Sequence, residues 1–184
     1  MLKITIPPVN RELWDESKQE FITIRFKGQT LQLEHSLVSL SKWEAKHHKL
    51  FLDKNDKTQE EIIDYIRCMT LTQNVDPEAY NHLTQKNIDD IQEYIDDPMT
   101  ATTIPEQPNK PHTGERVSSE LIYYWMIALN IPPEYQKWHL NRLLTLIKVC
   151  NIKNSPPKKM SQRELLRRNR AMNDARLKHA RHRG

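Results

Sequence analysis

Glycine is scarce in this chain, with three among 184 residues, and Gly28 is the only one before position 114. A phosphate-binding loop needs glycines so that backbone N–H groups can approach the anion closely. The sequence therefore excludes a glycine-rich phosphate loop. The motifs His-Glu-x-x-His, Gly-x-Ser-x-Gly and Gly-x-x-x-x-Gly-Lys-Ser/Thr are also absent. We predict a protein that is not an enzyme and that has no cofactor or metal.

Cysteines and long apolar runs are equally rare. Cys68 and Cys150 lie in apolar helical stretches without Cys-x-x-Cys spacing, which excludes a disulfide framework and a cysteine-rich zinc site. No segment approaches the roughly 18 apolar residues that span a bilayer, and no signal-peptide pattern opens the chain. We expect a protein of a reducing cytoplasm with no membrane partner.

Positive charge is concentrated near the C-terminus. Residues 153–184 contain 11 Lys and Arg against 2 Asp and Glu, a net of +9, whereas residues 1–152 contain 17 against 22, a net of −5. This asymmetry predicts a mildly acidic body with a basic arm that meets an anionic partner. A solvated tail without function is the alternative.

The first 34 residues have the pattern of β-structure. Apolar and polar residues alternate over 2–6, 21–26 and 31–33, which is typical of strands with one buried face. We expect three short strands, the last two forming a hairpin that turns near Gly28.

From Ser36 onward the apolar spacing becomes helical. Ser36, Thr58 and Thr84 can each cap a helix, and Asp76-Pro77 predicts a short helix between the last two. The two most apolar segments, 121–129 and 133–150, predict an αα-hairpin.

The first helix of this hairpin is apolar nearly all round, so we expect it to be the buried central helix. Ser118 or Ser119 can cap it. Ser161 and Glu164 have capping-box spacing for a terminal helix.

The predicted fold class is α+β: a small N-terminal antiparallel β-sheet followed by a mostly helical body and a basic C-terminal helix. Its regions are strands over 1–34, helices over 35–97, a proline-rich loop over 98–115, a central αα-hairpin over 116–152 and a basic arm over 153–184.

Carboxylates and histidines offer little for catalysis. Glu44 and His47 form one Glu-x-x-His pair beside His48, but a carboxylate-bridged di-iron site requires a second such pair. The favoured interpretation is a polar helix end. The neighbouring carboxylates at 89–90 and 96–97 point in different directions on a helix, which favours a solvated face. Cys68 and Cys150 are interpreted as packing residues.

Six aromatic residues gather on the predicted helices. Their neighbours are Leu, Ile and Met, so core packing is the favoured interpretation. A groove containing Trp43 and Trp138 that binds a partner is the alternative, and burial of these rings would separate the two. The six residues are Trp43, Tyr123, Tyr124, Trp125, Tyr135 and Trp138.

The basic arm is the strongest functional signal, because ten formal positive charges lie within the 26 residues from 158 to 183. Phosphates and acidic protein surfaces both attract such a field, and the choice between them stays open. The candidate partner-binding residues are Lys158, Lys159, Arg163, Arg167, Arg168, Arg170, Arg176, Lys178, Arg181 and Arg183, together with Trp43 and Trp138.

Four stretches of the chain resemble a family of small tail-module proteins of tailed bacteriophages and prophages, often labelled tail assembly chaperones. They are LQLEHSLVSLSKWE at 31–44, MTATT at 99–103, SELIYYWMIALNIP at 119–132 and QKWHLNRLLTLI at 136–147. The resemblance covers most of the chain.

The resemblance implies a non-enzymatic assembly factor of the host cytoplasm. Its partner would be the tape-measure protein, the tail-tube protein or both, whose apolar or coiled-coil surfaces it would cover before assembly. A homo-oligomer is compatible with this function. The alternative is a structural virion protein or a nucleic-acid-binding protein that uses the basic arm.

Overall fold

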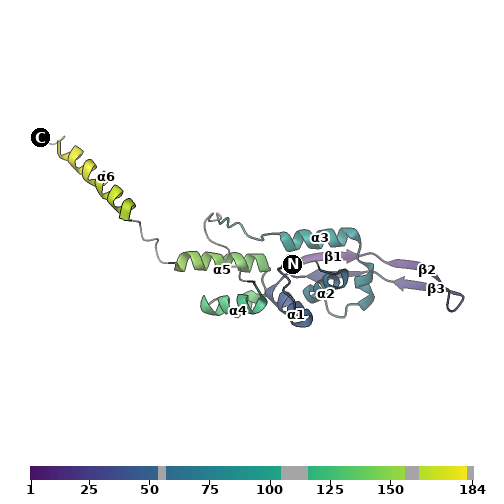
Figure 1. The fold of residues 1–184 in the computed structure, drawn as a ribbon. Coiled ribbons are helices and arrows are strands. Elements are labelled where there is room, and N and C mark those ends of the chain that lie inside the picture. Colours follow the sequence, from purple (N-terminus) through teal and green to yellow (C-terminus); the bar gives the residue numbers. More distant parts are fainter. Residues whose placement is uncertain (54–56, 105–115, 156–161, 182–184) are drawn as a thin grey trace. The chain divides into compact units, whose positions relative to one another are not determined.

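The computed structural model describes residues 1–53, 57–104, 116–155 and 162–181. The chain divides into two compact units, Met1–Asn151 and Ile152–Gly184. The predicted α+β class is confirmed: a small antiparallel β-structure is followed by helices (Figure 1). No helix in the described parts is long and apolar enough to cross a membrane.

The N-terminal strands form one long antiparallel ribbon. β1 (Leu2–Ile6) pairs with β4 (Gln29–Leu33), and β2 (Val9–Asp15) pairs with β3 (Glu20–Phe26). The register continues without a shift from the first pair of strands to the second. The chain therefore turns once, over residues 16–19, and Pro7-Pro8 interrupts the ladder because proline has no N–H to donate.

The predicted turn near Gly28 is wrong, and the strand β2 was missed. Gly28 lies in the interruption between β3 and β4 with φ +77°, and a Cβ there would lie 2.9 Å from both the Ile6 carbonyl oxygen and the Pro8 nitrogen. Gly28 thus allows a close backbone approach rather than a turn. The real turn uses Gln19 at φ 52°, a residue without a clear turn signal.

The predicted helix starts are confirmed. Ser36 caps α1 (Leu37–His47), Thr58 caps α2 (Gln59–Met69) and Thr84 caps α3 (Gln85–Asp96), each with a reciprocal capping box. The short helix at Asp76 is a 3₁₀ helix, η1 (Pro77–His82).

The C-terminal half of the first unit contains α4 (Ser119–Ala128), capped by Ser118, and α5 (Leu140–Asn154). The 3₁₀ helix η2 (Pro133–Lys137) lies between them, so the expected single helix over 133–150 is two elements. α4 ends where Asn130 adopts a left-handed conformation and the Ile131 N–H bonds to the Met126 carbonyl.

Two hydrophobic clusters hold the first unit together. One joins β1, β4, α2 and α3 around Trp43 and Tyr65, and the other joins α4 and α5 around Leu37 and Leu40. Because α1 contributes buried residues to both, it links the ribbon side of the unit to the α4 and α5 side (Figure 1). The second unit contains α6 (Gln162–Arg181). The expected cap at Ser161 lies outside the described residues.

Candidate protein-binding surface

The most distinctive exposed feature of the first unit is one side of α4. Ile122 and Met126 are buried on the inner side, with exposed fractions of 0% and 3%. Tyr124 and Ile127, three residues apart, are 63% and 76% exposed. Residues at this spacing lie on the same side of a helix. The expectation that this helix is buried on all sides is therefore wrong, because its apolar outer side faces solvent.

The N-terminus of α4 is attached to α1 by a buried carboxylate. Glu44 Oε2 accepts a hydrogen bond from the Ser119 backbone N–H at 2.7 Å, and Glu44 Oε1 accepts one from the Phe51 N–H at 3.2 Å. A negative charge at a helix N-terminus also interacts favourably with the helix dipole. Glu44 therefore fixes where α4, and with it the exposed pair Tyr124 and Ile127, sits on the body.

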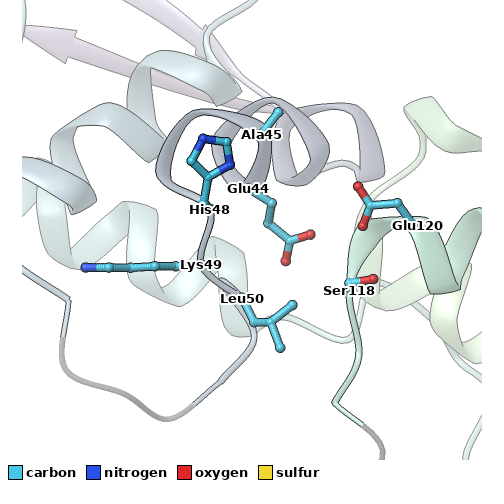
Figure 2. Close-up of a pocket in the computed structure, with 7 residues that line it drawn as sticks. All are labelled: Glu44, Ala45, His48, Lys49, Leu50, Ser118 and Glu120. Carbon is cyan, nitrogen blue, oxygen red and sulfur yellow. The ribbon is translucent and has the colours of Figure 1, made fainter.

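A pocket of about 250 Å³ lies beside this attachment. In Figure 2 the Glu44 carboxylate is directed toward the space between Leu50 and Ser118, while the Lys49 side chain extends away. The Glu120 pKa is lowered by hydrogen bonds from its own backbone N–H and the Ser118 hydroxyl. The carboxylates of Glu44 and Glu120 thus both accept hydrogen bonds from groups at the N-terminus of α4. The lining residues are Glu44, Ala45, His48, Lys49, Leu50, Ser118 and Glu120.

Trp138 belongs to a partly exposed stack after η2. Its ring stacks on Tyr135 with centroids 4.0 Å apart, and the Arg142 guanidinium lies 4.1 Å from the Trp138 ring centroid. This arrangement is a cation–π contact on an aromatic pair. Trp138 is half-buried, so it keeps some accessible surface for a partner.

Trp43 does not fit the expected partner groove. It is 1% exposed, and its indole N–H donates to the Glu61 carbonyl at 2.9 Å. Its placement as a partner-binding residue is corrected: the side chain belongs to the first core, as the core-packing interpretation required. The position of Trp43 on the apolar face of α1 is the feature of the sequence that indicated its burial.

The residues considered for a metal site are not brought together. Glu44 binds the two backbone N–H groups, His47 Nε2 lies 3.1 Å from Asp64 Oδ2, and His48 ends α1 in a left-handed conformation. A hydrogen bond from Lys46 holds the Asp64 pKa below its usual range. Among the described residues there is no group of three His, Cys, Asp or Glu that could hold a metal.

Both cysteines are free and half-buried. Burial raises the pKa of the Cys68 thiol, which disfavours the nucleophilic thiolate. This environment agrees with a packing residue.

Two buried histidines were not singled out from the sequence. His35 is 1% exposed, and its Nδ1 lies 2.6 Å from the Tyr65 hydroxyl oxygen. The ring of His139 is 5.1 Å from that of His35, and its Nε2 bonds to the Tyr94 carbonyl at 2.9 Å. Burial lowers the pKa of both histidines, that of His35 to about 3. The sequence feature that could have indicated burial of His35 is its place in the alternation of Leu31, Leu33 and His35.

The second unit presents an amphipathic basic helix. Arg163, Arg167 and Arg170 share one side of α6 by their spacing, while Leu165 and Met172, two turns apart, share another. Leu165 is 49% exposed and Met172 is 46% exposed. The helix thus offers both charge and apolar surface to a partner.

The described side chains of the other predicted arm residues, Arg168 and Arg176, are also exposed. Lys178 and Arg181 belong to the last turns of α6. Lys158, Lys159 and Arg183 lie outside the described residues.

The comparisons with known proteins return no relative: no family model matches the chain, and no curated protein or solved structure matches it either.

Proposed function

We propose that this chain is a tail assembly chaperone-like protein of a tailed bacteriophage, which binds the tape-measure or tail-tube protein in the host cytoplasm without catalysing a reaction. The observation that carries the proposal is the exposed apolar pair of α4, with Tyr124 63% and Ile127 76% exposed. An amphipathic helix of the partner covers such a pair by placing its own apolar side on it.

The surface is suited to binding because it is fixed in position. Glu44 attaches the start of α4 to α1, and Ile122 and Met126 anchor the opposite side of the helix in the core. Because the helix that carries Tyr124 and Ile127 is already folded and fixed, its backbone loses little conformational entropy when a partner binds. The same property lets α4 compete with self-association of an apolar helix in the partner.

The test is co-expression of the full chain with the tape-measure protein of the same phage. We expect the chain to co-purify with it and to raise its soluble fraction. The double variant Tyr124→Ser/Ile127→Ser should reduce co-purification at least tenfold. The matched control is Ile62→Ser/Leu71→Ser, which also replaces two exposed apolar residues, 42% and 52% exposed, and should bind as the unchanged chain does. Equal binding of both double variants contradicts the proposal.

A nucleic-acid-binding virion protein is the second candidate, favoured by the shared side of Arg163, Arg167 and Arg170 on α6. Each arginine that contacts a phosphate steepens the decrease of affinity with salt. Truncation after Ser155 separates the candidates. If α6 serves nucleic acid, the truncated chain loses DNA binding and keeps the tape-measure partner. If α6 serves the protein partner, the truncated chain binds that partner more weakly and with less salt dependence.

A further inference from the structure

The outer edge of the ribbon is covered along β4 and uncovered along β3. Beside β4, the Glu34 N–H donates to the Met69 carbonyl at 2.9 Å, and the Leu71 N–H donates to the Gln32 carbonyl at 2.8 Å. β3 continues this edge beyond Gly28, and within the described residues β2 is the one strand that pairs with it. A seven-residue strand with an unpaired edge is a template for another strand.

The order of residues in β3 determines which strand fits. β3 reads Glu-Phe-Ile-Thr-Ile-Arg-Phe, with an isoleucine on each side of the central Thr23. We propose that β3 pairs with β3 of a second copy of this chain, antiparallel, with the two-fold axis at Thr23. Two ribbons then form one four-stranded antiparallel sheet. This edge is separate from the α4 surface, so the inference does not depend on the proposed function.

The symmetric register places compatible residues opposite one another in the middle of the strand, and Glu20 opposite Phe26 of the second copy at each end. Ile22 lies opposite Ile24 of the second copy, and β-branched cross-strand pairs stabilise antiparallel sheets. Phe21 lies opposite Arg25 of the second copy, which allows a cation–π contact in both halves of the dimer. Phe21 is 69% exposed in the single chain, so its ring is accessible for this contact.

The other edge of the ribbon is unsuited to the same pairing. β2 reads Val-Asn-Arg-Glu-Leu-Trp-Asp, and its central residue is Glu12. Symmetric pairing of β2 would place two glutamates directly opposite each other, and like charges in that position are destabilising. This repulsion between like charges disfavours self-pairing of β2, so we assign the self-pairing to β3.

The first test introduces a positive charge at the proposed two-fold axis through Thr23→Lys. Thr23 lies opposite Glu12 within the ribbon, so Thr23→Lys gives the single chain a favourable cross-strand pair. In the dimer the same substitution places two lysines opposite each other. We expect sedimentation equilibrium of the full chain to show a monomer–dimer equilibrium, and Thr23→Lys to raise its dissociation constant at least tenfold. The control Thr30→Lys, an exposed threonine of β4, should leave the constant unchanged.

The second test is a cross-link in the background Cys68→Ser/Cys150→Ser. Residues directly opposite in an antiparallel pair have Cα atoms about 4.5–5.5 Å apart, within reach of a disulfide. Thr23→Cys should therefore form a disulfide dimer under mild oxidation, whereas Glu12→Cys should not. A chain that is monomeric at 100 µM, a dimer that Thr23→Lys does not weaken, or cross-linking through Glu12→Cys instead would each overturn the inference.

Discussion

Glu44 and Ser119 are 75 positions apart in the sequence, yet the Glu44 carboxylate accepts the Ser119 backbone N–H at 2.7 Å. The same carboxylate also accepts the N–H of Phe51, and Glu44 is only 7% exposed. One side chain on α1 thus satisfies two backbone donors from other segments. The helix that carries the proposed binding surface depends on this contact for its position.

Removing this carboxylate should destabilise the first unit. Glu44→Ala leaves two sheltered N–H groups without a protein acceptor, at an expected cost of about 2–4 kcal/mol in the free energy of unfolding. Glu44→Gln should cost less, because its amide oxygen replaces one acceptor. Urea unfolding of the full chain measures both, with exposed Glu60→Ala as the control that changes little. A Glu44→Ala variant as stable as the control contradicts this assignment.

Truncation should destabilise the protein on the inner side of α4 and have little effect on its outer side. Ile122→Ala opens a cavity in the second core and should lower the free energy of unfolding by about 2–4 kcal/mol. Ile127→Ala removes an exposed side chain and should change it by less than about 0.5 kcal/mol. The pair is matched in residue type and helix, so urea unfolding compares them directly. Similar losses for both would mean that the outer side of α4 is covered after all.

The helix starts could be predicted from the sequence because capping is local. Ser36, Thr58 and Thr84 each act on an N–H three residues away, so the pattern that identifies them lies within one turn. The α+β class followed from apolar periodicity for the same reason.

The ribbon topology and the exposure of α4 are set by contacts between distant segments. Composition alone could not show which residues of an apolar helix face solvent, because that depends on where α1 and α5 pack against it. Glu44 was considered as a metal ligand, whereas its partners are the backbone of Phe51 and Ser119. No spacing rule connects these positions.

Gly28 offers a test of the ribbon interruption. Gly28→Ala combines an unfavourable left-handed conformation with a Cβ only 2.9 Å from backbone atoms of Ile6 and Pro8, which cannot move as a flexible side chain would. We expect a loss of about 2–4 kcal/mol in the free energy of unfolding. Gln19→Gly, at the left-handed position of the true turn, should change it by about 1 kcal/mol or less. A Gly28→Ala variant with an unchanged free energy of unfolding would contradict the close approach of Gly28 to the backbone of Ile6 and Pro8.

The buried histidines predict how stability depends on pH. Burial lowers the pKa of His35 to about 3 and also lowers that of His139, while in the unfolded chain both titrate near their ordinary value of 6.5. Below pH 6.5 the unfolded state therefore binds more protons than the folded state, so stability is complete above this pH and decreases as the pH falls toward 3. Each fully linked histidine contributes a slope of about 1.4 kcal/mol per pH unit.

Urea unfolding between pH 7.5 and 5 isolates this effect, because the lowered pKa values of Glu61 and Asp64 affect stability only at more acidic pH. His35→Gln keeps a polar group that can hydrogen-bond to the Tyr65 hydroxyl and removes one titrating group. The slope should therefore decrease by about 1.4 kcal/mol per pH unit, which corresponds to one proton. The control Gln59→Ala, which replaces an exposed side chain that does not titrate, should leave the slope unchanged. A free energy of unfolding that is constant over this range would mean that His35 and His139 accept protons in the folded chain, and the packed arrangement of the two rings would then be wrong.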